Sequence, residues 1–181
     1  MASNQWTHKA EWNTLRETAA ADISSNYSKL GTLVGADAVE AGTTDTIITA
    51  TAHAAVVGDE IIMTSGDEAE EAREVTAVDT NTITLESALS GTPTATETFD
   101  IIRPVAISQN GGKLLLGNNR LNGPVYLSFD GTTDHLYWFN STTITLDLKA
   151  SGLHAERGGY IYCRHAGSAP ASGSLYVSEV A

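Results

Sequence analysis

The stretch YLSFDGTTDHLYWF, residues 126–139, gives the strongest indication of fold in this chain. On both sides of Asp130 and Gly131 the side chains alternate in the manner of a half-buried β-strand. An Asp-Gly pair between two such strands is a strong signal for a β-hairpin. Gly131 can adopt the positive φ angle that the turn needs, and Asp130 can accept hydrogen bonds from the backbone just after it. We therefore interpret Asp130 and Gly131 as structural turn residues.

The same stretch also contains candidates for chemistry. Asp130 and Asp134 could bind a calcium ion together, but Ca²⁺ needs about six to eight oxygen ligands and no further acidic ligands are evident here. His135 could act as a general base, but no serine or cysteine motif accompanies it. We expect both aspartates to be turn residues, and we expect no metal, no cofactor and no catalysis at this hairpin.

Strand-like segments continue on both sides of the hairpin, which predicts a mostly β protein. Residues 103–181 contain seven short segments with turn signals between them, as in a compact antiparallel β-sandwich. Residues 36–102 contain five segments rich in Ile, Val and Thr at about ten-residue spacing, which predicts a small β-barrel inserted before the sandwich. The segments are 46–51, 59–65, 73–79, 82–87 and 98–104 in the barrel, and 103–108, 113–118, 123–130, 135–140, 143–150, 160–166 and 174–180 in the sandwich.

Residues 1–35 are predicted to form a short N-terminal helix and an arm. In THKAEWNTLRETAAAD, residues 7–22, Trp12 and Leu15 begin an apolar stripe with spacings of three and four residues. One short helix is marginally stable alone, so it would pack either on a sheet of its own domain or on another subunit. Trp6 and Trp12 favour the intersubunit arm, because aromatic side chains are common anchors of interfaces.

The formal net charge of −12 is confined to one segment. From Asp37 to Asp100 there are fourteen acidic residues and one basic residue, Arg73, whereas the rest of the chain has eight acidic and nine basic residues. Binding to nucleic acid or to anionic lipid depends largely on Lys and Arg. We therefore expect neither sequence-specific nucleic acid nor a membrane to be a partner of this protein.

Cys163 is the only cysteine, so an intrachain disulfide and a cysteine-based zinc site are excluded. We interpret Cys163 as a small core residue. No apolar run approaches the roughly 20 residues that span a bilayer, and the first residues lack the apolar stretch of a signal peptide. We expect a soluble protein made in the cytoplasm, and because no group of residues assembles into an active site, we predict that it is not an enzyme.

Several of these segments together resemble a known family, the small β-rich virion structural proteins of tailed bacteriophages. In that family, an N-terminal segment is followed by an Arg-Pro strand, an S-x-D-G hairpin, a Leu-Asp-Leu strand and a closing strand pair with a G-S-x-P-x-S-G turn. The matching segments are NYSKLGTLVG (26–35), RPVAISQN (103–110), VYLSFDGTTDHLYWF (125–139), TITLDLKA (143–150) and IYCRHAGSAPASGSLYVS (161–178). The acidic residues between the first two segments correspond to an insertion.

The resemblance implies a virion protein that forms a ring at the head-tail junction, as a connector, adaptor or neck protein. Its partners would be further copies of itself and a portal, tail or major capsid protein. A capsid decoration (cement) protein is one alternative, and a carbohydrate-binding module with a stacking platform of Tyr137 and Trp138 is another. The interface candidates, with core packing as the alternative for about half of them, are Trp6, Trp12, Leu15, Tyr126, Tyr137, Trp138, Tyr160, Tyr162 and Tyr176.

Overall fold

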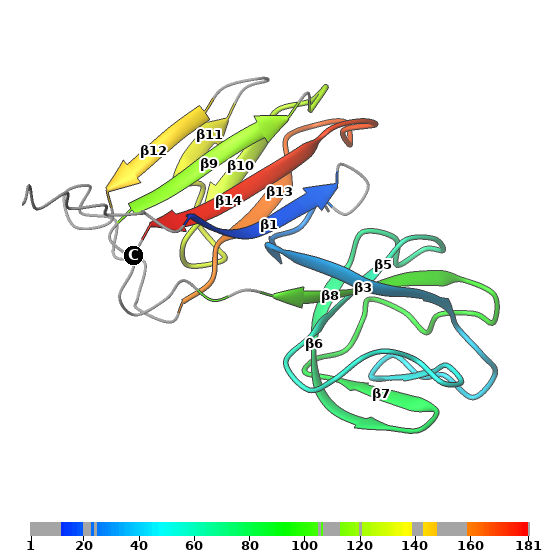
Figure 1. Ribbon diagram of the computed structural model, residues 1–181. Helices are drawn as coiled ribbons and strands as arrows, with labels where there is room; N and C mark the ends of the chain where they lie inside the picture. Colours follow the sequence, from blue (N-terminus) through cyan, green and yellow to red (C-terminus); the bar gives the residue numbers. More distant parts are fainter. Residues whose placement is uncertain are drawn as a thin grey trace, which may run out of the picture.

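The computed structural model describes residues 12–19, 23, 25–104, 106, 113–119, 121–138, 143–147 and 159–180. These residues build a mostly β protein with antiparallel sheets, and none of them lies in a helix. The described strands belong to three sheets, and two of these sheets occupy one lobe while the third forms the other (Figure 1).

The first lobe contains two four-stranded sheets. We call the sheet with order β1-β14-β9-β12 the terminal sheet; it consists of β1 (Trp12–Ala19), β14 (Ser174–Val180), β9 (Lys113–Asn119) and β12 (Thr143–Asp147). We call the sheet with order β11-β10-β13-β2 the hairpin sheet; it consists of β11 (Leu136–Trp138), β10 (Val125–Ser128), β13 (Tyr162–His165) and β2 (Ser28–Lys29). Buried apolar side chains of this lobe include Leu121, Val125, Leu127, Ile161, Cys163 and Leu175.

The second lobe is a six-stranded sheet that contains most of the acidic residues, and we call it the acidic sheet. Its strand order is β3-β8-β5-β6-β7-β4. Its strands are β3 (Gly31–Ala38), β4 (Ile47–Thr49), β5 (Glu60–Met63), β6 (Ala72–Asp79), β7 (Thr82–Leu85) and β8 (Thr98–Pro104). The sheet therefore takes in residues 31–104, which extends beyond the range 36–102 at both ends.

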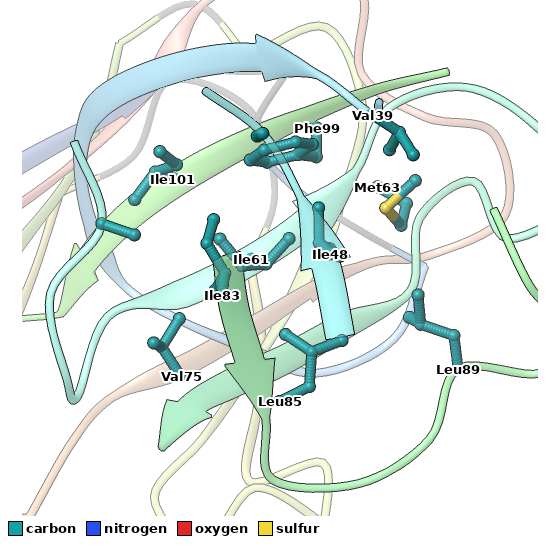
Figure 2. Close-up of a cluster of buried hydrophobic side chains, with 12 residues drawn as sticks. Val39, Ile48, Ile61, Met63, Val75, Ile83, Leu85, Leu89, Phe99 and Ile101 are labelled. Atoms are coloured by element: carbon teal, nitrogen blue, oxygen red, sulfur yellow. The ribbon is translucent and has the colours of Figure 1, made fainter. Parts of the chain in front are cut away.

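The acidic sheet has a hydrophobic core of its own. Phe99 and Met63 are fully buried in it, and side chains from five of its strands point toward one another there (Figure 2). Alternate residues of β5, β7 and β8 supply this core, because every second side chain of a strand faces the same side. Its members are Val39, Ile48, Ala50, Ala55, Ile61, Met63, Val75, Ile83, Leu85, Leu89, Phe99 and Ile101.

The prediction of a helix over residues 7–22 was wrong for the part of this segment that the structure describes. Residues 12–19 form β1, which pairs antiparallel with β14 from Trp12 opposite Val180 to Ala19 opposite Ser174. A short helix with one narrow apolar stripe has little to stabilise it, whereas a strand along β14 satisfies the backbone groups of both partners. Residues 1–11 and 20–22, including Trp6, lie outside the described residues.

The two lobes meet where the chain passes from β2 to β3 through Leu30 alone. Gly31, at the start of β3, lies so close to β8 that an added Cβ would overlap the side chain of Ile102 and approach the Arg103 carbonyl oxygen to 2.9 Å. The strand neighbours of Ile62 and Ile102 face the core of the acidic sheet, so these two side chains point away from that core. Both are nevertheless buried. The chain therefore enters the acidic sheet in close contact with β8.

Candidate functional site

One face of the hairpin sheet carries a row of aromatic and charged side chains, which we call the tyrosine face. Tyr126 lies opposite Tyr137 of β11 and opposite Arg164 of β13, so the three side chains share one face. The rings of Tyr126 and Tyr137 are 4.9 Å apart between centroids, and the Arg164 Cζ lies 4.5 Å from the centre of the Tyr126 ring. Tyr137 is 44% exposed and lies on β11, the last strand of this sheet.

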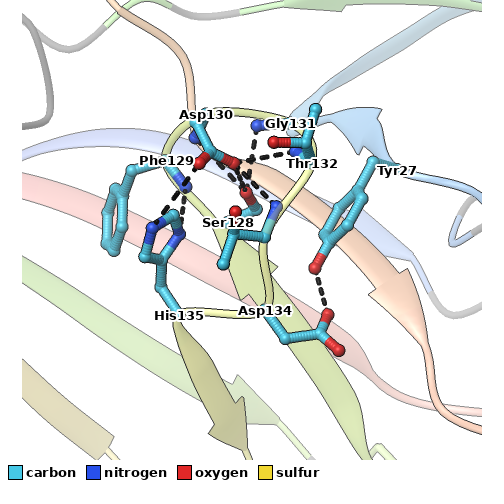
Figure 3. Close-up of polar contacts among 9 residues, drawn as sticks. Tyr27, Ser128, Phe129, Asp130, Gly131, Thr132, Asp134 and His135 are labelled. Carbon is cyan, nitrogen blue, oxygen red and sulfur yellow. Dashed lines mark hydrogen bonds and ion pairs between the residues drawn. The ribbon is translucent and has the colours of Figure 1, made fainter.

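Asp134 holds Arg164 in place on the tyrosine face. Arg164 donates two hydrogen bonds to the two oxygens of Asp134, at 3.1 and 2.7 Å. The Tyr27 hydroxyl donates to the same carboxylate (Figure 3). The hydrogen bonds from Arg164, with a smaller contribution from Tyr27, hold the pKa of Asp134 below its usual range against the effect of burial. This ion pair is bidentate and keeps the guanidinium in a fixed orientation.

The loop between β10 and β11 is held by Asp130. One of its carboxylate oxygens accepts the N–H groups of Thr132 and Thr133, both at 2.8 Å, and the hydroxyl of Ser128 at 2.9 Å (Figure 3). Gly131 has a φ of 74°, in the left-handed region. The hydrogen bonds from the Thr132 and Thr133 backbones hold the pKa of Asp130 well below its ordinary value. Asp130 and Gly131 thus occupy the turn.

The other candidates of this loop are also engaged within it. His135 Nδ1 accepts the N–H of Phe129 at 3.2 Å, and its Nε2 lies 3.7 Å from Asp130 Oδ2. Among the described residues, Asp134 accepts hydrogen bonds from the side chains of Arg164 and Tyr27. Within the described part of the chain, no three His, Cys, Asp or Glu side chains are grouped so that they could hold a metal ion.

The structure brings only some of the predicted interface residues together. Tyr126 and Tyr137 meet on the tyrosine face, and Tyr162 lies half-buried on the same sheet. Tyr160 is half-buried, pairs with Ala106 in an isolated bridge and lies under the Lys29 ammonium at 4.8 Å. Trp12, Leu15, Trp138 and Tyr176 lie on β1, β11 and β14, but their own side chains are not among those described.

A second candidate site is a pocket at the junction of the two lobes, which we call the junction pocket. It has a volume of about 360 Å³. Lys29 and Tyr162 of the hairpin sheet form one side, and residues of the acidic sheet form the other. The lining residues are Lys29, Glu60, Ala72, Arg73, Glu74, Glu86, Ser87 and Tyr162.

Lys29 bridges two carboxylates in this pocket. Glu60 of β5 and Glu74 of β6 lie directly opposite each other, an arrangement of like charges that destabilises a sheet. The backbone N–H of Lys29 donates to Glu60 Oε2 at 2.7 Å, and its ammonium donates to Glu74 Oε2. Lys29 is only 8% exposed. Because Lys29 belongs to the hairpin sheet and both glutamates belong to the acidic sheet, this contact ties the two sheets together.

Burial changes the ionisation of the groups in this pocket. Glu60 is 5% exposed, and burial raises its pKa to about 7, although the hydrogen bond and charge of Lys29 oppose the change. For Lys29, burial acts to lower the pKa, but the hydrogen bond and charge of Glu74, together with the charge of Glu60, outweigh it and raise the pKa. Strongly shifted groups that line a pocket are candidates for function.

A second polar contact joins the lobes at Glu70. His165 of β13 lies with Nε2 3.2 Å from Glu70 Oε2, and Asn26 donates to the Glu70 carbonyl at 3.4 Å. A hydrogen bond from Ser25 is the main cause that lowers the pKa of Glu70, with further contributions from His165. The acidic segment 66–74 therefore supplies contacts of the lobe junction.

The chain was compared with known proteins, and no family model, no curated protein and no solved structure matches it. Among the residues described, there is no helix that could cross a membrane. The tyrosine face and the junction pocket therefore define the candidate sites by their geometry alone.

Proposed function

We propose that this chain is a non-enzymatic structural component of a tailed-bacteriophage virion, and that it forms a ring at the head-tail junction as a connector, adaptor or neck protein. The tyrosine face is the observation that carries this proposal. The Tyr126 ring lies against Arg164, and Arg164 is held by Asp134. Tyrosine and arginine are the residue types that are enriched where protein interfaces are strongest.

The occupant that we propose for the tyrosine face is the acidic sheet of a second copy. In a ring, each subunit uses two different surfaces toward its two neighbours. The acidic segment carries a large negative charge, and the tyrosine face, on which Arg164 is paired with Asp134, adds no net negative charge against it. The acidic sheet also exposes large apolar side chains in Leu33 (44%), Val56 (47%) and Val57 (61%), which a neighbour would bury.

The finer architecture belongs to the same proposal. We interpret the terminal and hairpin sheets as the two layers of an antiparallel sandwich, with their buried side chains between them. We interpret the acidic sheet as a small barrel inserted into it, since its strands surround one core. The Lys29 and Glu70 contacts would then hold the barrel against the sandwich in every subunit of a ring.

Counting copies in purified particles tests this role. A connector ring predicts roughly six to twelve copies per particle, whereas the alternative, a capsid decoration protein, predicts hundreds. Quantitative mass spectrometry against the major capsid protein measures the number. Absence of the chain from purified particles would contradict both roles.

A second candidate function, carbohydrate binding, is favoured by one observation. Tyr126 and Tyr137 lie beside the planar polar groups of Arg164 and Asp134, and sugars bind to such combinations of rings and hydrogen-bonding groups. Among the described side chains, Tyr137 and Tyr126 supply the rings of this platform. Glycan-array binding that Tyr137→Ala abolishes would favour this function over a ring.

A further inference from the structure

The junction pocket presents hydrogen-bond acceptors that the described residues leave unused. Glu60 Oε2 accepts the Lys29 N–H, but Glu60 Oε1 has no hydrogen-bond partner among the described residues. The carboxylate of Glu86 at the rim and the hydroxyl of Tyr162 have no such partner within the described ranges either.

The cations of the pocket are already committed to other groups. The Lys29 ammonium donates to Glu74. Arg73 donates to Glu71 Oε2 at 2.6 Å and to the Ala88 carbonyl at 3.0 Å. The free groups in the pocket wall are therefore mainly acceptors, and the surrounding segment is strongly negative, which concentrates cations in a recess of this kind.

We propose that the junction pocket binds an organic cation with several N–H donors, an ammonium or guanidinium group, between the carboxylates of Glu60 and Glu86. A space of about 360 Å³ is at the lower end of the range for ligand pockets and accommodates the end of a lysine or arginine side chain with water. Tyr162 also lines the pocket, and a tyrosine hydroxyl can accept a hydrogen bond. The pocket geometry supports this inference independently of the proposed virion role.

The ionisation of Glu60 gives the binding a characteristic pH dependence. A bound cation favours the ionised carboxylate, and burial has raised the pKa of Glu60 to about 7. Affinity should therefore increase roughly tenfold between pH 6 and pH 8, as Glu60 changes from mostly protonated to mostly ionised. The titratable and charged side chains that line this pocket with Glu60 are Lys29 from β2, Arg73 and Glu74 from β6, Glu86 beyond β7 and Tyr162 from β13.

Calorimetric titration of the full chain with ethylguanidinium and butylammonium, at constant ionic strength, tests this site. We expect saturable binding at pH 8 that weakens roughly tenfold at pH 6 and is lost in the double variant Glu60→Gln/Glu86→Gln. The control is Asp67→Asn, which removes one exposed acidic charge outside the pocket. Thermal unfolding would establish that each variant is folded.

Two results would overturn the inference. One is the absence of saturable binding at pH 8, and the other is equal weakening by Asp67→Asn, which would show general attraction to an acidic surface. Capped tripeptides with a central Lys or Arg distinguish the source of the cation. Tighter binding of the peptides than of butylammonium supports a side chain of a partner protein, and equal binding supports a small free cation.

Discussion

Replacement of Glu60 by glutamine tests the electrostatics of the lobe junction. An ordinary glutamate has a pKa near 4.5, whereas burial raises the pKa of Glu60 to about 7. Between these values the folded protein retains a proton that the unfolded chain has lost. The free energy of unfolding therefore decreases as the pH rises from below 4.5 to above 7.

The size of this effect follows from the two pKa values. Their difference corresponds to about 3 kcal/mol of unfolding free energy at pH 8. Glutamine carries no charge, and its amide oxygen can still accept the N–H of Lys29. Glu60→Gln should therefore match the wild-type protein at pH 4 and exceed its stability by up to about 3 kcal/mol at pH 8.

Urea unfolding at pH 4, 6 and 8, followed by tryptophan fluorescence, measures this difference. Glu86→Gln is the matched control, because it removes an exposed carboxylate from the same pocket and should change stability by less than about 0.5 kcal/mol. A wild-type protein and a Glu60→Gln variant with parallel pH dependence would refute the reasoning. Lower stability of the variant at every pH would show that the folded protein needs this charge.

Three further substitutions test the packing and the turn. Gly31→Ala should reduce the free energy of unfolding by about 1–3 kcal/mol, because the new Cβ overlaps Ile102; an unchanged urea midpoint would show that β3 can move away from β8. Asp130→Ala should lower the melting temperature, because two backbone N–H groups of the loop lose their acceptor, whereas Asp130→Asn should keep most of it; equal losses would assign the effect to charge. Phe99→Ala should reduce the stability of the fully buried core of the acidic sheet by about 3–5 kcal/mol, seen as faster proteolysis of this lobe, and unchanged proteolysis would contradict that expectation.

Most strands of the acidic sheet were predictable because their information is local. β4 to β8 each overlap a segment in which Ile, Val and Thr alternate with polar residues between turn signals. β3 was not predicted as a strand, because GTLVGADA contains two glycines and two alanines, which have low β propensity. Its conformation depends on pairing with β8, which lies about sixty residues later in the chain.

The N-terminal segment is a second case in which the local sequence did not predict the structure, because it indicated a helix where a strand forms. Spacings of three and four residues around Trp12 and Leu15 predicted a helix, yet β1 pairs with β14 at the other end of the chain. A periodic pattern describes one segment, whereas a strand pairing depends on two. Long-range pairing therefore outweighed the local preference.

The features of the candidate sites were likewise predictable where adjacent residues encode them, and were not predictable where they depend on long-range pairing. The turn at Asp130 and Gly131 is encoded by adjacent residues, and the sequence also suggested Tyr126 and Tyr137 as interface positions. Arg164 was not predicted, because its place beside Tyr126 depends on the register of β10 and β13. The junction pocket was missed because Lys29 and Glu60 are residue types that are rarely buried, and no local pattern indicates that they meet.

The most direct test of the proposed function is whether the tyrosine face joins copies of the chain. Sedimentation velocity of the purified protein over a range of concentrations measures the oligomeric state. We expect a closed oligomer for the wild-type protein, mainly monomer for Tyr137→Ala, and an unchanged oligomer for Ser168→Ala, a control that changes an exposed side chain between β13 and β14, outside both the tyrosine face and the acidic sheet. A wild-type protein that remains monomeric at all concentrations, or an oligomer that Tyr137→Ala leaves intact, would contradict the account.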